Sequence, residues 1–253
     1  LAARIIQLSP PRTAIIGTFH IAPFSKLHKF STWALGYVLR PNLGLFDSVI
    51  SVSSAAQQTA KSTFNIDSKI IPNVVDYSRL NISKNKLADQ KDIVFLGRLV
   101  KRKGCLELVK AYEYLLQNQK NMIVPNLVIA GDGPDRAKIE KYITNNKLTK
   151  HIKLLGRVTE EDKAKLLSGA KIAVFPSTGG ESFGIVLIEA MACGSGVVLG
   201  GDNPGYSEVL QKKDYLFNPK NVKLFASKLE EFINRDLTSD HKFQYELMKK
   251  FDV

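Results

Sequence analysis

Short apolar runs alternate with amphipathic segments along most of the chain. The runs at 92–97 and 171–175 are rich in Ile, Val and Phe and end at Gly or Pro, which predicts buried strands. The segment 104–119 instead carries apolar residues at every third or fourth position, which predicts a helix with one buried face. Strands and helices in alternation are typical of parallel sheets that are covered by helices.

The same pattern gives the order of the elements. The predicted strands cover 13–18, 47–52, 69–71, 92–97, 126–130, 152–155, 171–175 and 196–199. The predicted helices cover 26–40, 53–62, 104–119, 135–145, 160–168, an apolar stretch that ends at Gly194, and 221–233. A polar stretch at 78–90 separates the first three strands from the others.

We therefore predict an α/β fold with two doubly wound parallel-sheet domains, residues 1–76 and 77–253. Three strands are too few for an independent nucleotide-binding sheet, so we expect the first domain to be incomplete in this chain.

Charge and cysteine content narrow the classes of partner. The net charge of +12 favours acidic partners: nucleotide phosphates, anionic lipid surfaces or nucleic acid. The two cysteines, Cys105 and Cys193, both fall in predicted helices, which favours a reducing compartment such as the cytoplasm over a disulfide framework. The apolar run 183–200 contains Glu189 and several glycines, so it predicts a helix, a turn and a strand rather than a membrane span.

The stretch Ser177–Gly194 carries the clearest chemical signal. A predicted strand precedes it, and the stretch itself consists of a glycine-rich loop followed by an apolar helix. The free backbone amides at the helix start and the positive end of the helix dipole together form an anion site that suits a pyrophosphate. Those amides belong to Ser182, Phe183, Gly184, Ile185 and Val186. Glu181 precedes the anion site and Glu189 follows it, so the two carboxylates can bind hydroxyl groups on either side of the phosphates. The alternative is a buried helix in which Glu189 is a paired core carboxylate.

Other candidate residues also follow predicted strands, where ligands of doubly wound sheets bind. Arg98 and Lys103, in the loop that opens at Gly97, can converge on a phosphate, although a solvated basic loop is the alternative. Gly131 and Asp132 begin a turn that is either structural or part of the same cleft.

These motifs together resemble the retaining glycosyltransferases of family 4, which have the GT-B fold. The run Gly179–Gly184 and the seven residues between Glu181 and Glu189 match the family's signature. Ile71-Pro72-Asn73 and Thr18-Phe19-His20 match in order as well, and the combination is closest to the bacterial phosphatidylinositol α-mannosyltransferases.

The resemblance implies a function and roles for these residues. It implies that a hexose, mannose from GDP-mannose, is transferred to a hydroxyl acceptor, an inositol lipid, with retention and without a required metal or cofactor. Arg98 and Lys103 would bind the donor diphosphate, Glu181 the transferred sugar and Glu189 the ribose. The resemblance further implies that Gly156, Arg157 and Val158 line the base site, and that His20 faces the donor sugar. The sequence contains no Asp-x-Asp metal pair, which agrees with metal-free transfer.

Alternatives remain open at this stage. The chain can be a non-catalytic nucleotide-binding fragment of such an enzyme, or a transferase that uses a UDP-sugar and a non-lipid acceptor. No nucleic-acid-binding motif is present, and the lysines are scattered among loops, so we expect no nucleic-acid partner.

A membrane partner is a further expectation. Lys26, His28, Lys29 and Arg40, with Phe24, Phe30 and Trp33, can form a basic and aromatic helix face. Such a face suits an anionic bilayer and predicts peripheral binding at the inner face of the plasma membrane, although a helix with its apolar face in the core is the alternative.

Overall fold

A computed structural model describes residues 14–22, 26–77, 87–119 and 122–252; at 26–29, 39–42 and 88 it describes the backbone alone. The chain divides into two compact units. The first comprises residues 1–73 together with 180–183, and the second comprises 74–179 and 184–253. The polar stretch that we expect to link two domains lies mostly outside the described residues, at 78–86.

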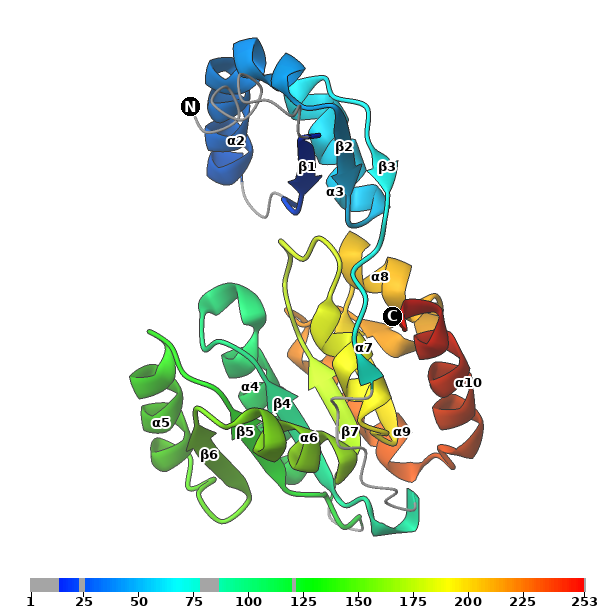
Figure 1. The fold of residues 1–253 in the computed structure, drawn as a ribbon. Coiled ribbons are helices and arrows are strands. Elements are labelled where there is room, and N and C mark those ends of the chain that lie inside the picture. Colours follow the sequence, from blue (N-terminus) through cyan, green and yellow to red (C-terminus); the bar gives the residue numbers. More distant parts are fainter. Residues whose placement is uncertain (1–13, 23–25, 78–86, 120–121, 253) are drawn as a thin grey trace. The chain divides into compact units, whose positions relative to one another are not determined.

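The first unit contains a three-stranded parallel sheet in the order β1-β2-β3 (Figure 1). Its strands are β1 (Ile16–Phe19), β2 (Ser48–Ser51) and β3 (Lys69–Ile70). Two helices make the crossovers between successive strands, α2 (Lys26–Leu39) and α3 (Ser54–Thr59). Ser53 caps α3 as the sequence predicts, because its hydroxyl oxygen accepts a hydrogen bond from the Ala56 amide at 3.0 Å.

The second unit contains a six-stranded parallel sheet in the order β6-β5-β4-β7-β8-β9. Figure 1 labels β6, β5, β4 and β7 of this sheet. The strands are β4 (Asp92–Leu96), β5 (Leu127–Ala130), β6 (Ile152–Gly156), β7 (Ala170–Phe175), β8 (Val197–Gly201) and β9 (Leu216–Phe217). The chain builds outward from β4 to β6, then returns to place β7 beside β4. The strand order therefore reverses between β4 and β7, which is where doubly wound sheets bind their ligands.

Helices cover this sheet and bury apolar faces against it. They are α4 (Cys105–Asn118), α5 (Arg136–Asn145), α6 (Glu160–Ser168), α7 (Ile185–Ala192), α8 (Pro204–Leu210), α9 (Val222–Asn234) and α10 (Thr238–Met248). In α4, the side chains of Leu108, Tyr112 and Leu115 are fully buried at the predicted helical spacing. Cys105 and Cys193 are buried free thiols. Within the described residues, no helix is both long and apolar enough to span a membrane.

Among the α-helices and strands described in the second unit, α8, β9 and α10 were not predicted. The strand β9 pairs with β8 only at Gly200 and Gly201. Further along that edge, the Gln244 side chain in α10 takes the place of a strand partner. Its amide donates to the Val198 carbonyl at 2.9 Å and its oxygen accepts from the Val198 amide at 2.8 Å. A polar helix is thus fixed by hydrogen bonds to a strand distant in sequence, which apolar periodicity does not reveal.

Candidate functional site

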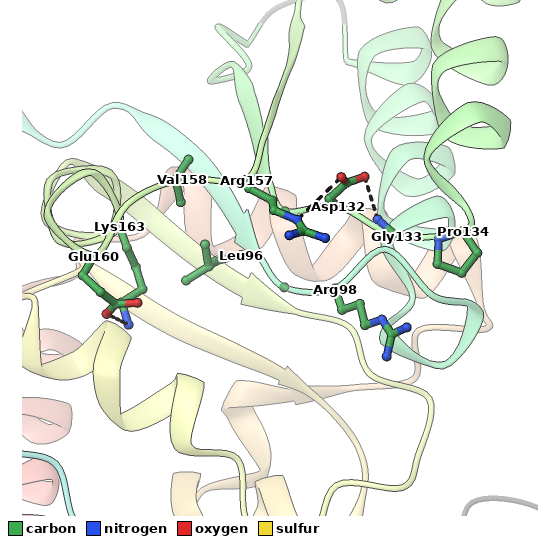
Figure 2. Close-up of a pocket in the computed structure, with 11 residues that line it drawn as sticks. Leu96, Arg98, Asp132, Gly133, Pro134, Arg157, Val158, Glu160 and Lys163 are labelled. Atoms are coloured by element: carbon green, nitrogen blue, oxygen red, sulfur yellow. Dashed lines mark hydrogen bonds and ion pairs between the residues drawn. The ribbon is translucent and has the colours of Figure 1, made fainter.

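A cleft of about 700 Å³ opens in the second unit, where β4, β5 and β6 end (Figure 2). Its lining residues come from the end of β4, from the loops after these three strands and from the first turn of α6. They are Leu96, Gly97, Arg98, Gly131, Asp132, Gly133, Pro134, Arg157, Val158, Glu160 and Lys163. The structure therefore brings together Gly97, Arg98, Gly131, Asp132, Arg157 and Val158, all of which were sequence-based candidates.

Backbone contacts hold the strand ends of the cleft in place. The Gly97 amide donates to the Ala130 carbonyl at 3.0 Å, and the Gly131 amide donates to the Gly156 carbonyl at 2.7 Å. Gly131 has φ +134°, and a Cβ atom there would lie 1.9 Å from the Gly97 carbonyl oxygen. Only glycine fits this close approach, so the backbone geometry requires a glycine at position 131, and the same residue also lines the cleft.

Asp132, in the loop after β5, contacts Arg157 in the loop after β6 and so connects these two loops at one end of the cleft. Its Oδ1 accepts a hydrogen bond from the Gly133 amide at 2.8 Å, and its Oδ2 lies 3.8 Å from Nε of Arg157 (Figure 2). The Arg157 side chain is 88% exposed, so this ion pair is weak and the guanidinium is accessible.

Lys163 forms a bridge between two carboxylates at the opposite end. Its Nζ lies 2.5 Å from Glu160 Oε2 and 3.1 Å from Glu189 Oε1. Burial of the amine disfavours its charge, but the hydrogen bonds to Glu160 and Glu189 outweigh that effect and raise the pKa of Lys163 above its ordinary value. Glu189, which belongs to α7 and does not itself line the cleft, is thereby connected to it.

The basic turn after β4 is joined to the loop after β7. The carbonyl oxygen of Arg102 accepts hydrogen bonds from the Thr178 amide at 2.8 Å and the Ser177 hydroxyl at 3.1 Å. Gly104 has φ +71°, and a Cβ atom there would lie 2.0 Å from the Pro176 carbonyl oxygen. The two loops thus form one surface at the reversal of strand order. Lys103 lies half-buried in this turn and is not among the residues that line the cleft.

The glycine-rich loop leads into α7 through Gly184, the N-cap residue, at φ +105°. A Cβ atom at Gly184 would lie 2.6 Å from the Tyr206 ring, so a side chain there would displace α8. The amides of Ile185 and Val186 occupy the first turn of α7, where a helix provides no acceptor for them. Of the five expected amides, those of Ile185 and Val186 therefore lie at the start of α7.

The remaining candidates belong to the first unit. Glu181, Ser182 and Phe183 lie in the segment 180–183, which packs with that unit, and Phe183 is buried. His20 follows β1 and is exposed. The cleft itself is built from the second unit alone, so it tests none of these four assignments.

Sequence reasoning missed several lining residues, of which Glu160 and Lys163 carry charge. A usable signal was present, because both residues lie in the helix that directly follows the Gly156–Val158 turn. Their spacing of three positions puts them on the same helix face. The helix itself was predicted, but the residues of its first turn were not assigned to the site.

Comparisons with known proteins identify the family of the chain and its fold. A family model described as glycosyl transferases group 1 matches residues 78–249. The phosphatidyl-myo-inositol mannosyltransferase of Mycobacterium tuberculosis strain H37Rv is 32% identical over 199 residues, which are 77% of this chain and 50% of that protein. The protein of the same name from Mycobacterium leprae is 33% identical over 73% of this chain and 48% of its own length. The chain spans about half the length of these curated relatives.

Solved structures share the fold. A variant of S. aureus TarM, solved with fondaparinux, alpha-GlcNAc-glycerol and UDP, superposes with a TM-score of 0.79 at 21% identity, covering 98% of this chain and 50% of that one. Anabaena HepE with UDP and glucose gives a TM-score of 0.75 at 20% identity, covering 95% and 68%. At these identities the likeness is one of fold, and it establishes the GT-B architecture that the sequence motifs implied.

Proposed function

The chain belongs to the group 1 glycosyl transferases, and we propose that it transfers a hexose from a nucleoside-diphosphate sugar to a hydroxyl acceptor with retention of anomeric configuration. The observation that carries this proposal is the cleft at the carboxyl ends of β4, β5 and β6, which has the exposed Arg157 at one end and Lys163, bound to the carboxylates of Glu160 and Glu189, at the other. A basic group and helix-start amides suit a diphosphate, and a carboxylate suits sugar hydroxyls.

Each candidate residue then has a role. Arg98 and Lys103 offset the negative charge that builds on the leaving diphosphate, together with the amides from Ser182 to Val186. Glu189 accepts hydrogen bonds from the ribose and Glu181 from the transferred sugar. His20 contacts the reacting region of that sugar. The turns at Gly131–Asp132 and Gly156–Val158 enclose the nucleotide. We propose that no cofactor and no protein-bound metal is needed.

GDP-mannose is the proposed donor. The names of the mycobacterial relatives support mannose as the sugar. The cleft offers a physical reason for guanine, because the Glu160 carboxylate is 86% exposed and can accept from two adjacent N–H groups. Guanine presents such a pair on its pairing edge, whereas uracil presents a single N–H. The TarM and HepE structures contain UDP, so a UDP-sugar is the competing donor.

The proposed acceptor is a phosphatidylinositol-type lipid, reached by peripheral binding at the inner face of the plasma membrane. In α2, Phe30, Trp33 and Tyr37 are 63%, 52% and 69% exposed, and their rings follow one another at 6.0 and 6.5 Å. Aromatic side chains on a surface helix suit the headgroup region of a bilayer. The other members of the expected basic face lie outside the described residues or have undescribed side chains: Phe24, Lys26, His28, Lys29 and Arg40.

Calorimetry and a transfer assay on the same sample test the donor proposal. GDP should bind at least tenfold more tightly than UDP or ADP. Arg98→Ala should lower the rate of mannose transfer by about a hundredfold or more, since it removes a charge that stabilises the transition state. Lys101→Ala is the control, because Lys101 lies in the same turn, is exposed and does not line the cleft. Near-normal transfer by Arg98→Ala would contradict the assignment.

The second candidate function is that of a nucleotide-binding fragment without transfer activity. The observation in its favour is that the chain spans only about half of its curated relatives. GDP binding without any mannose transfer would select this alternative. Absence of binding to any nucleoside diphosphate would reject both.

A further inference from the structure

Lys163 occupies an unusual position for a lysine in a surface helix. Its side chain is only 11% exposed, and it lines the cleft while reaching from α6 to Glu189 in α7. We propose that Lys163 is a positioning residue for the donor: it holds Glu189 by Oε1 and so presents the other carboxylate oxygen, Oε2, to the ribose hydroxyls. This inference rests on the proposed function, in which Glu189 binds the ribose.

The hydrogen-bonding pattern of Glu189 supports this role. Lys163 donates to Oε1 at 3.1 Å, and among the residues that the structure describes none donates to Oε2. The Glu189 side chain is 21% exposed, so it is partly sheltered from water. A glutamate side chain rotates about several bonds, and a fixed partner at one oxygen removes most of that freedom before the ligand arrives.

The charge balance of the cleft points the same way. A nucleoside-diphosphate ligand is anionic, and Glu160 and Glu189 place two carboxylates at one end of its site. Lys163 lies between them, at 2.5 Å from Glu160 and 3.1 Å from Glu189. Its positive charge offsets their repulsion of each other and of the ligand.

A neighbouring pair shows what an ordinary ion pair on this helix looks like. Lys165 contacts Glu161 at 2.7 Å, four positions earlier in α6, with side chains that are 66% and 69% exposed. Such a pair stays within one helix and is solvated, so it contributes little. Lys163 differs because it is sheltered and connects two helices at the cleft. Lys165→Met is therefore a matched control for Lys163→Met.

The test is a thermodynamic cycle between the side chain and the ribose hydroxyls. Calorimetry measures the binding of GDP and of 2′,3′-dideoxy-GDP to the unmodified protein, Lys163→Met, Lys163→Arg and Lys165→Met. For the unmodified protein, loss of the hydroxyls should weaken binding about tenfold to a hundredfold, as expected for hydrogen bonds to a charged group. In Lys163→Met, removal of the ribose hydroxyls should weaken binding by only about threefold or less, because Glu189 is no longer held.

The controls separate positioning from simple destabilisation. Lys163→Arg should recover most of the hydroxyl effect, and Lys165→Met should retain all of it. Circular dichroism checks that each variant is folded; if Lys163→Met is not, Lys163→Gln takes its place in the cycle. A hydroxyl effect in the Lys163 variant as large as in the unmodified protein overturns the inference but leaves the proposed function standing. Failure of the unmodified protein to bind GDP, UDP or ADP overturns both.

Discussion

Glu189 shows how one residue can satisfy two interpretations of the sequence. The pattern left open whether it is a paired carboxylate in an apolar helix or a ligand for a sugar hydroxyl. In the structure it is paired, since Lys163 binds its Oε1. The pairing nevertheless takes place at the edge of a cleft rather than in a closed core, so it does not exclude a ligand. A carboxylate that is held at one oxygen and partly sheltered from water is oriented, which is what hydroxyl recognition requires.

At Gly131 the structure predicts a large effect from one added methyl group. In Gly131→Ala the new Cβ would meet the Gly97 carbonyl oxygen, and the residue would keep a φ of +134°. We expect the free energy of unfolding to fall by about 2 to 4 kcal/mol, measured by urea denaturation, with a matching loss of GDP affinity.

Gly194→Ala separates the effect of the steric clash from the effect of backbone strain. Gly194 also has a positive φ, +79°, but a Cβ atom there would have nothing within 4 Å. Backbone strain alone should cost it about 1 to 2 kcal/mol. Equal losses in the two variants would mean that the close approach between the strand ends is not important.

Between elements, ion pairs and hydrogen bonds fix what apolar packing leaves undetermined. Asp214 precedes β9 and binds two cations of the α9 region: Lys228 at 3.2 Å and Arg235 at 2.6 Å. Next to it, the Tyr215 hydroxyl donates to Asp240 in α10 at 2.9 Å. Burial raises the pKa of Tyr215, and this hydrogen bond raises it further. These contacts attach the short strand β9 to two helices.

The Asp214 contacts should make stability depend on pH in a defined direction. Partial burial would raise the pKa of Asp214, but the hydrogen bonds from Arg235 and Lys228 outweigh it and hold the pKa below its ordinary value. A carboxylate with a depressed pKa in the folded state stabilises the fold above its unfolded pKa and stops doing so as the pH falls through the folded value.

Asp214→Asn should therefore lower the free energy of unfolding by about 0.5 to 1 kcal/mol at pH 7, a range suited to a half-exposed pair. The difference should shrink once the pH falls below about 4. Urea denaturation at pH 7 and pH 3 measures it, with Glu230→Gln in α9 as the control. A difference of the same size at both pH values would contradict the ionic explanation.

For the whole molecule, the net charge of +12 is the property with the widest consequences. Positive charge draws the protein towards anionic surfaces over a range that salt shortens. The exposed aromatic side chains of α2 would then add contacts that salt does not weaken. The two contributions can be separated experimentally.

Flotation with vesicles should distinguish them. We expect binding to vesicles that contain phosphatidylglycerol at about 0.05 M salt, weaker binding at about 0.5 M, and none to phosphatidylcholine alone. Trp33→Ser should reduce binding at both salt concentrations, whereas Tyr245→Ser, at an exposed aromatic position in α10, should not. Equal effects of the two substitutions would remove α2 from the proposal.

The sequence by itself determined the strands and helices from β4 to β8, because their apolar residues recur at the spacing of a strand or of a helix and so indicate which positions are buried. It also indicated which loops follow the ends of strands, since strand ends and glycines are visible in order along the chain. Arg98 could be placed at the cleft for that reason, whereas Gly131 was left open and Val158 was placed there only through the family resemblance.

Only the tertiary structure decided the contacts that depend on distant partners. Lys163 reaches Glu189 across 26 positions, and Gln244 completes the edge of β8 from 46 positions away. The helices that carry them, α6 and α10, are largely polar, so apolar spacing could not reveal which neighbour each would meet. Such contacts arise from the way the chain folds back on itself, because hydrogen bonds depend on position in space and leave no period in the sequence.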